Sequence, residues 1–449
     1  MLSWSMPQHY RSPLQLYVHC ANSVHYLAEL NASLPGVELY AERALLLADS
    51  QDVVCVPDEI EPSYLAYLAR LGIGPNPVNV LVASRFEGAA TATPLWEKIL
   101  RSDEALGVLS CLIQSHGAAR LHPFIGTAGP FSLARALAEK AGLPVDVAGG
   151  NPSVVAYADF KHHVRAKAME LGIPVAEGEV VDLTAAGGHR RQEERMLRHA
   201  MERQMRRTGR VIVRGASGAA GSSTFTVDQD RNISALAEFA AARRENSIYL
   251  VESMVEVTVS PNVQMHICPD GSATRCGGVT DQRWDRPLVH GGNRFPSTAH
   301  CMVDMLGWAR TLAEWLGRLG FAGLAGFDFV EYNDEHGKPK AFLAEVNPRT
   351  NGASYPLRLR QRLNVSQREA GFPAITAFTS GTIKTEAASF DELQDIWGDA
   401  LFSPERGTGL IPYVTGLLRH GKCSVVALAA TPGEADELYE EAGATTVAL

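Results

Sequence analysis

Two acidic positions on either side of a turn constrain this chain more than any other feature. Asp328 lies in an apolar run, and Glu345 begins the sequence Glu-Val-Asn-Pro-Arg beyond a polar turn segment. Within that segment, Gly337 can adopt a positive φ. If the turn centres on Gly337 and the residue before it, antiparallel pairing brings Asp328 opposite Glu345. Asn347 then lies one step along, on the same face of the strand.

Two carboxylates and an amide oxygen that converge in this way form a site of oxygen ligands. Mg²⁺ prefers such ligands, takes few of them from a protein and shares the remaining positions with phosphate groups. We therefore predict Asp328, Glu345 and Asn347 as metal ligands. An amphipathic hairpin with solvated acids fits the same spacing, so the pattern alone leaves that alternative open.

A glycine-rich loop lies upstream, between two β-branched runs in residues 211–227. Backbone N–H groups in such a loop can close over phosphate oxygens, because no side chain blocks their approach. The loop has neither the Gly-Lys-Ser/Thr ending of a P-loop nor the clear following helix of a dinucleotide-binding turn. A flexible hairpin without a ligand is an equally good interpretation.

An apolar segment, residues 247–255, follows this loop and includes Glu252. Its composition predicts a strand that runs into a short connector. Such a strand end can present backbone groups and an acid to the edge of an adenine ring. In isolation, the same segment would more often be an ordinary core strand.

The order of these segments resembles that of the ATP-grasp superfamily of carboxylate–amine ligases. That family begins its nucleotide-binding part with a lysine-bearing helix and an aliphatic strand, which correspond here to residues 159–175 with Lys161. A basic residue and glycine loop, an acidic hinge strand and an Asp…Glu-x-Asn set follow in the same order within residues 156–356. Arg214 departs from the lysine that usually heads the loop. Arginine keeps the charge but is bulkier and differently directed.

The resemblance implies ATP and Mg²⁺ as cofactors and assigns roles by position. The implied ATP-binding residues are Lys161, Arg214, Gly215, Ser217, Gly218, Gly221, Ser222, Ser223, Glu252, Ser253, Met254, Val255 and Asn262. Arg349 is implied to steady the oxyanion that forms when an amine attacks, although Pro348 could end the strand before it. Arg275 and Arg283, in or beside a polar glycine-rich stretch, are candidates for γ-phosphate or carboxylate contacts. A surface loop with incidental charges explains that stretch equally well.

A narrower resemblance is to the pheganomycin-type peptide ligases. It is carried by residues 149–152, residues 345–356 and a small C-terminal α/β tail. It implies antibiotic biosynthesis: ATP would activate the carboxylate of an unusual amino acid as an acyl phosphate, which is then coupled to the amino group of a peptide. The alternatives are an ATP-grasp ligase with a small amine or amino-acid acceptor, an ATP-binding protein without ligase activity, and a metal-dependent hydrolase.

The expected architecture is α/β, becoming α+β in the ATP-grasp part. We predict a pre-ATP-grasp α/β domain at 1–155, a two-lobed ATP-grasp domain at 156–390 with the nucleotide cleft between its lobes, and a small C-terminal domain at 391–449. The lid subdomain is expected at about 160–252. In the first domain the pattern predicts strands at 38–47, 53–56 and 78–83 and a helix at 130–141.

Composition narrows the possible partners. The formal charge of −9 disfavours nonspecific nucleic-acid binding, and no apolar run approaches the ~18–20 residues that span a bilayer. The start of the chain lacks a signal pattern, so we expect a cytoplasmic protein, with a homodimer among its possible assemblies. Residues 187–210 contain eight arginines and predict a solvated lid helix, with an acidic partner as the alternative. His290 and His300 lack a third ligand at a rigid spacing, so zinc is not favoured.

Overall fold

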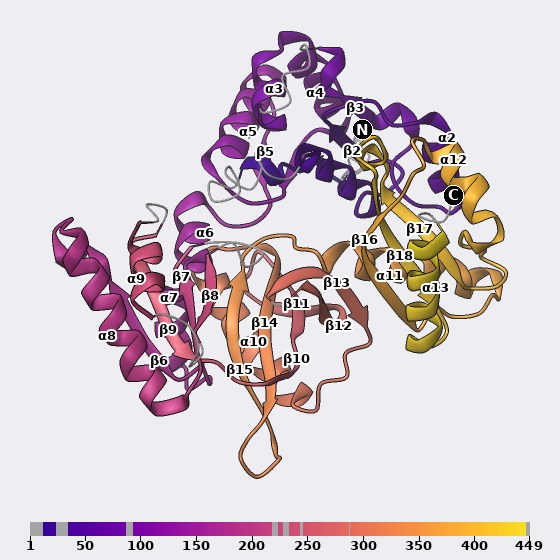
Figure 1. Ribbon diagram of the computed structural model, residues 1–449. Coiled ribbons are helices and arrows are strands. Elements are labelled where there is room, and N and C mark those ends of the chain that lie inside the picture. The colour runs from indigo at the N-terminus through magenta and orange to yellow at the C-terminus, as the bar shows by residue number, and fades with distance from the viewer. Residues whose placement is uncertain are drawn as a thin grey trace, which may run out of the picture.

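Short apolar strands form a parallel sheet in the first part of the chain. The computed structural model describes residues 12–23, 35–86, 93–217, 223–227, 233–242, 246–286 and 288–445 (Figure 1). The strands are β1 (Leu14–Val18), β2 (Val53–Val56), β3 (Val80–Val82), β4 (Ala119–Pro123) and β5 (Val145–Val147). They pair in the order β3-β2-β1-β4-β5, so the strand order reverses between β1 and β4. Helices α2 (Pro62–Arg70), α3 (Leu95–Arg101), α4 (Asp103–His116) and α5 (Ala128–Ala141) accompany the sheet.

The strand expected at 38–47 is wrong, because this segment is the 3-10 helix η3 (Val37–Leu46). It begins after Gly36, whose φ is 85°, and it buries apolar residues on most of its circumference. An almost continuous apolar run fits a buried strand or a buried helix equally, so periodicity could not separate the two. The strand β1 was missed, although Leu14, Leu16 and Val18 alternate in the pattern of a strand.

Helices α6 (Pro152–Asp159) and α7 (Lys161–Glu170) lead into the smaller lobe, which we call the lid. The lid has a four-stranded sheet in the order β6-β9-β7-β8. Its elements are β6 (Gly178–Asp182), α8 (Arg190–Thr208), β7 (Val211–Gly215), β8 (Thr224–Val227), α9 (Ile233–Ala242) and β9 (Ile248–Ser253). The arginine-rich helix α8 buries Leu197, Ala200 and Met201 against this sheet, so the helix has an apolar stripe on one face. The aliphatic strand expected to end at Val175 forms only a single bridge to Leu343.

A nine-stranded sheet forms the larger lobe and continues to the end of the chain. Its order is β10-β14-β11-β12-β13-β16-β18-β17, with β15 paired to β14. The strands are β10 (Val257–Val259), β11 (Pro261–Ile267), β12 (Ala273–Arg286), β13 (Val289–Phe295), β14 (Gly323–Asn333), β15 (Pro339–Asn347), β16 (Ala377–Lys384), β17 (Gly409–Val414) and β18 (Lys422–Ala429). The helices are α10 (Met302–Arg318), α11 (Ser354–Ala370), α12 (Phe390–Trp397) and α13 (Pro432–Thr445).

The predicted domain boundary at 390–391 falls inside this continuous sheet. Strand β16 lies before the boundary, yet it pairs along its whole length with β18, which lies after it. Helix α13 begins with the reciprocal capping contacts that its sequence predicts. The Thr431 N–H donates to Glu434 Oε2 at 3.1 Å, and the Glu434 N–H donates to Thr431 Oγ1 at 3.3 Å.

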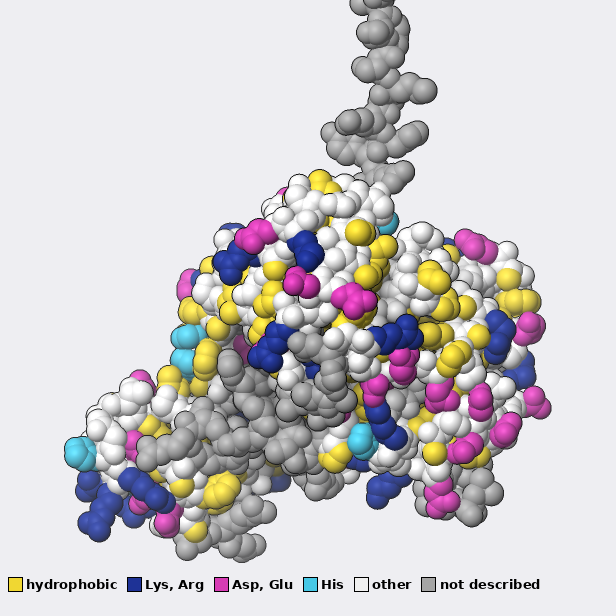
Figure 2. Space-filling model, turned by 90° about the horizontal axis from the view of Figure 1, so that it is seen from above, with side chains coloured by type: hydrophobic (Ala, Val, Ile, Leu, Met, Phe, Trp, Pro, Cys, Tyr) yellow, Lys and Arg dark blue, Asp and Glu magenta, His cyan; other side chains and the backbone are white. Residues whose placement is uncertain are grey.

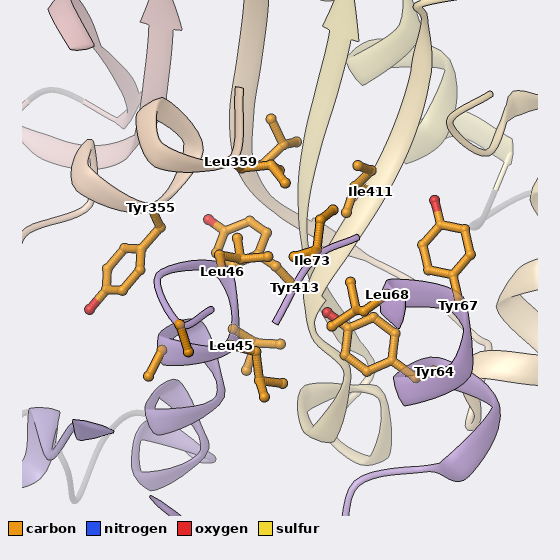
Figure 3. Close-up of a cluster of buried hydrophobic side chains, with 14 of the residues drawn as sticks. Leu45, Leu46, Tyr64, Tyr67, Leu68, Ile73, Tyr355, Leu359, Ile411 and Tyr413 are labelled. Atoms are coloured by element: carbon orange, nitrogen blue, oxygen red, sulfur yellow. The ribbon is translucent and has the colours of Figure 1, made fainter. Parts of the chain in front are cut away.

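One hydrophobic core joins the first domain to the C-terminal strands. Leu45 of η3, Tyr64 of α2, Tyr355 and Leu359 of α11 and Ile411 of β17 belong to the same buried cluster (Figure 3). The buried Tyr64 hydroxyl donates to the Pro412 carbonyl at 2.8 Å, so this hydrogen bond also joins the first domain to β17. The first domain and the C-terminal strands are therefore packed as one unit. No helix in the described ranges is long and apolar enough to cross a membrane.

A buried acid at this junction makes the stability of the protein depend on pH. Burial raises the pKa of Glu42 to about 7 from 4.5, although the Gly416 N–H donates to its Oε2 at 3.1 Å. The unfolded chain ionises Glu42 at a lower pH than the folded protein does. Its contribution to the free energy of unfolding is therefore complete below about pH 4.5 and is lost as the pH rises through 7.

We expect Glu42→Gln to increase the free energy of unfolding at pH 8 by a few kcal/mol and to change it little at pH 5. A pKa change of one is equivalent to about 1.4 kcal/mol, and the amide keeps an acceptor for Gly416. Urea unfolding at both pH values measures the difference. The exposed Glu335→Gln variant is the control. An equal effect of Glu42→Gln at both pH values would contradict the assignment.

Candidate active site

The β14–β15 hairpin brings the two predicted acids together. Asp328 lies opposite Glu345, as the sequence predicts, and Asn347 lies opposite Gly326. The predicted position of the turn is wrong by half a residue, because Phe329 lies opposite Leu343 on the turn side of the acids. Ala344 has no opposite residue and forms a β-bulge. This extra residue shifts the register by one, so that Asp328 and Glu345 are paired although the turn is not where the sequence placed it.

The bulge at Ala344 also decides which faces these side chains take. In a regular strand, Leu343 and Glu345 would project from the same face. The extra residue separates them, so Leu343 packs into the hydrophobic core while Glu345 lines a cavity with Asp328. The bulge thus lets a buried apolar strand present a carboxylate to the cavity.

Amide side chains hold the carboxylate of Asp328. Asn262 Nδ2 donates to its Oδ1, and Asn347 Nδ2 donates to its Oδ2 at 2.8 Å. Burial, and then the charge of Glu345, raise the pKa of Asp328. Lys161 Nζ lies 3.6 Å from Glu345 Oε1 and balances part of this charge. We call Asp328 and Glu345 the acid pair.

Arg349 lies beside the acid pair. Its Nη1 donates to Asn347 Oδ1 and lies 3.2 Å from Asp159 Oδ1. The guanidinium is buried. Strand β15 ends at Asn347, as Pro348 allows, yet the Arg349 side chain still lies beside Asn347 in the site.

Glu252 in the lid strand β9 lies between two arginines. Its Oε2 accepts from Arg214 Nε at 2.9 Å and Nη2 at 2.6 Å, and its Oε1 accepts from Arg165 Nη1 at 2.7 Å. Glu252 is 1% exposed, so this is a buried ion network. Sequence reasoning missed Arg165. The signal was its position four residues after Lys161 on α7, which puts both cations on one helix face.

Arg214 connects the lid to the β14–β15 hairpin. Its third donor, Nη1, bonds to the carbonyl of the bulge residue Ala344 at 2.9 Å. All three guanidinium nitrogens are therefore in use, which is a consequence of arginine at the position where lysine is usual.

A cavity of about 350 Å³ brings most of the predicted site residues together. It is lined by Lys161, Arg214, Gly215, Ser223, Glu252, Ser253, Met254, Val255, Asn262, Asp328, Glu345, Asn347 and Arg349. Apolar side chains form another part of its wall: Ile212, Val330 and Phe342. Further lining residues that the sequence did not indicate are Phe124, Gln282, Trp284, Leu288, His290, Asn293 and Asn351.

Several predicted residues lie elsewhere. The Ser217 N–H and Oγ both bond to Asn246 Oδ1 at 2.9 Å, and Ser217 is not in the cavity wall. Gly218, Gly221 and Ser222 lie outside the described residues. The Arg275 backbone lies in β12 opposite Met265, and its side chain is likewise outside the description.

Arg283 does not face the cavity. The polar stretch expected to be a loop is the β12–β13 hairpin, in which Arg283 alternates with the lining residues Gln282 and Trp284. Its side chain therefore emerges on the opposite face, where the guanidinium lies 4.2 Å from the centre of the Tyr439 ring. The role predicted for it does not fit this position.

The two histidines considered for zinc are also separate. His290 lines the cavity, whereas His300 Nδ1 lies 3.1 Å from Glu331 Oε1. Within the described ranges there is no group of three or more His, Cys, Asp or Glu side chains that could hold a metal ion. The acid pair with Asn347 is a different kind of site, made of two carboxylates and an amide.

Comparison with known proteins identifies the fold. The family model of the pre-ATP-grasp domain matches residues 41–139. A search of curated protein sequences gives no match. An ADP complex of purK, N5-carboxyaminoimidazole ribonucleotide synthetase, is similar over 96% of this chain and 96% of that chain, with a TM-score of 0.54 at 11% identity.

Two further solved structures have the same architecture. Biotin carboxylase from Campylobacter jejuni, in a β-γ-ATP complex, is similar over 95% of this chain and 90% of that chain, with a TM-score of 0.57 at 12% identity. The N5-carboxyaminoimidazole ribonucleotide synthetase of Thermus thermophilus is similar over 98% and 99%, with a TM-score of 0.52 at 13% identity. The chain has the ATP-grasp fold. Identities this low establish the fold and leave the reaction to be argued from the site.

We expect Glu252→Gln to destabilise the lid sheet, because it leaves Arg165 and Arg214 buried side by side without a counter-charge. Breaking a buried ion network in this way costs about 3–5 kcal/mol. Hydrogen exchange of the β7 and β9 amides measures the free energy at which this sheet unfolds locally. Glu179→Gln is the matched control, since the pair Glu179–Arg203 is exposed and contributes within about 1 kcal/mol. A similar loss in both variants would contradict a special role for Glu252.

Proposed function

We propose that this protein is an ATP-dependent carboxylate–amine ligase that forms a C–N bond and releases ADP and phosphate. The observation that carries the proposal is the acid pair, which lies with Lys161 in the wall of one cavity between lid and larger lobe. The neighbouring structures include an ADP complex and an ATP complex, which agrees with a nucleotide in this cleft.

The donor set of the site fits Mg²⁺. Asp328, Glu345 and the Asn347 amide oxygen are hard oxygen donors, and Asp328 is buried beside a second negative charge that a cation would balance. When bound there, Mg²⁺ would neutralise phosphate charge during phosphoryl transfer. In this structure Asn347 Oδ1 accepts from Arg349. An amide oxygen has two lone pairs, so it could keep this hydrogen bond and still be a ligand of the cation.

The reaction that suits these residues is activation of a carboxylate as an acyl phosphate. A free carboxylate is a poor acyl donor because its leaving group would be oxide. Attack of a carboxylate oxygen on the γ-phosphorus of ATP breaks the bond to ADP and forms a mixed anhydride. An amine then attacks the carbonyl carbon, and phosphate leaves with the C–O bonding electrons while the nitrogen loses a proton.

The residues around the acid pair divide this work. Lys161 is the cation nearest the acid pair and is suited to a phosphate oxygen. The apolar residues Ile212, Val330 and Phe342 fit the faces of a flat ring such as adenine. Arg349 supplies a positive charge for the oxyanion of the tetrahedral intermediate. Arg214, with its three nitrogens engaged, holds the lid to β15 and is better suited to positioning than to phosphate binding.

A peptide acceptor, as in the pheganomycin-type ligases, agrees with the length of the cavity wall. Beyond the acid pair, the wall continues along the β12–β13 hairpin through Gln282, Trp284 and His290. Trp284 is 44% exposed and Leu288 has a φ of 65°, which is strained for a leucine. An exposed tryptophan and a strained residue on a cavity wall are typical of ligand contacts. We therefore propose that the acceptor lies along this hairpin.

We expect Asp328→Asn and Glu345→Gln each to lower ATP-dependent turnover on the order of 100-fold or more, because each removes a charge that holds the metal. Stability should stay the same or rise, since the remaining acid loses a like-charged neighbour. ADP release during a Mg²⁺ titration and thermal unfolding measure the two effects. Glu335→Gln, at the exposed tip of the same hairpin, is the control. Near-normal Mg²⁺-dependent turnover in either variant would contradict the metal assignment.

A panel of acids and amines, scored for ADP and phosphate release, tests the function itself. We expect ADP release only when an acid and an amine are both present, with the amide product identified by mass spectrometry. Turnover with bicarbonate would instead indicate a carboxylase, and equal rates with peptides and single amino acids would remove the peptide acceptor. ATP binding without ADP release for any pair, or turnover without ATP, would refute the ligase.

A further inference from the structure

Arg43, on η3 of the first domain, has no counter-charge in the part of the chain that the structure describes. Among the described residues its guanidinium has no hydrogen bond and no ion pair, and its Nε is buried without a partner. Charged groups withdrawn from water are normally paired, because an isolated charge is costly in a poorly solvated place. The arginines of the active site follow this rule, since Arg165, Arg214 and Arg349 all contact carboxylates. Arg43 is the exception to be explained.

Three tyrosine rings surround Arg43. Its guanidinium carbon lies 4.0 Å from the centre of the Tyr40 ring, 5.8 Å from Tyr355 and 5.9 Å from Tyr413. Tyr40 and Arg43 are three residues apart on a 3-10 helix, where such side chains eclipse one another. Aromatic faces attract a cation and fix its orientation, but they leave its N–H donors unused. The rings therefore hold the guanidinium ready for an acceptor.

Arg43 is connected to the candidate cavity through Tyr355, His19 and Phe124, of which only Phe124 lines the cavity. Tyr355 is at the edge of the buried cluster (Figure 3), and its hydroxyl lies 3.1 Å from His19 Nδ1. The His19 ring packs against Phe124, which lines the cavity. Burial first, and then the charge of Arg43 among others, lower the pKa of His19 to about 3 and also lower the pKa of His290 in the cavity wall. Both imidazoles are therefore neutral near pH 7 and place no second positive charge beside Arg43.

The topology of the first domain leads to the same place. In an open parallel sheet, ligands bind at the carboxyl ends of the strands where the strand order reverses. Here that point lies between β1 and β4. His19 directly follows β1 and Phe124 directly follows β4. His19 and Phe124 therefore lie at the expected ligand-binding end of the sheet, between the cavity and Arg43.

We propose that Arg43 binds an oxyanion group, a carboxylate or a phosphate, that an organic substrate carries in addition to the carboxylate being activated. This rests on the proposed ligase function and adds a substrate class to it. The substrate would extend from the acid pair past Phe124 and His290 to the tyrosine-framed cation. A planar guanidinium with free donors suits a bidentate contact to such a group.

Arg43→Met tests the site by binding. Methionine keeps an apolar stem against Tyr40 and removes the charge. The probes are inorganic phosphate and succinate, titrated by calorimetry into full-length protein saturated with Mg²⁺ and a non-hydrolysable ATP analogue, so that the nucleotide site is filled. We expect the wild-type protein to bind at least one probe, and Arg43→Met to bind it about tenfold more weakly or worse. The probe that binds more tightly distinguishes a phosphate from a carboxylate.

Arg70→Met is the matched control. Arg70 also lies over a tyrosine, 5.9 Å from the centre of the Tyr67 ring, but it is exposed on α2. The Arg70→Met variant should bind both probes as the wild-type protein does. Arg43→Lys, which keeps a charge without the planar fork, should bind with intermediate affinity and shows that position 43 tolerates substitution. Equal binding by Arg43→Met and wild type, or binding of neither probe by wild type, would overturn the proposal.

A turnover measurement separates this proposal from the proposed function. With an acid and amine that release ADP, Arg43→Met should raise the KM of the substrate bearing the second charge and leave the KM for ATP unchanged. Replacing that charge by an amide should weaken the wild-type protein but not Arg43→Met. If a charged substrate and its amide serve the wild-type protein equally well, the site is refuted. If no pair releases ADP, the ligase proposal fails while the calorimetry still decides the role of Arg43.

Discussion

Holding two carboxylates opposite one another is the constraint around which the active site is built. Like charges across a strand pair repel, and burial strengthens that repulsion. Asp328 is nevertheless buried beside Glu345. The surroundings offset this cost with hydrogen bonds from Asn262 and Asn347 and with the charge of Lys161. Such an arrangement contributes little to folding by itself, which favours a role in binding a cation.

The lid carries a second charge network of the opposite composition, with one acid between two arginines. Glu252 contacts Arg165 on α7 and Arg214 on β7, and Arg214 also reaches the carbonyl of Ala344 on β15. The same guanidinium therefore bonds to a lid strand and to the strand that carries Glu345. Movement of the lid away from the larger lobe would break this carbonyl contact, which couples the position of the lid to the β14–β15 hairpin.

Sequence reasoning located residues whose relation depends on local periodicity. The acid pair follows from a turn and the two-residue repeat of strands, and the stripe on α8 follows from helical spacing. The bulge at Ala344 could not be predicted, because it compensates for the error in the assumed position of the turn and leaves the pairing of the acids unchanged. Long-range contacts could not be predicted either. Nothing local indicates that Glu252 faces Arg165, that Arg283 turns toward Tyr439, or that η3 is helical rather than extended.

The bulge at Ala344 shifts the register of the β14–β15 hairpin by one residue between the acid pair and the turn. The Arg214 contact fixes the hairpin at the bulge, the core packing of Leu343 fixes it next to the bulge, and Tyr332 pairs with β10 farther out. The hairpin ends in a turn that projects from the body of the molecule (Figure 1), and the residues at its tip are exposed. On the face seen from above, side chains of Lys, Arg, Asp and Glu are scattered among hydrophobic ones (Figure 2). The outermost turn, around Glu335, lies beyond Val330 and Phe342, which line the cavity. A change in the length of that turn would therefore leave the cavity wall in place.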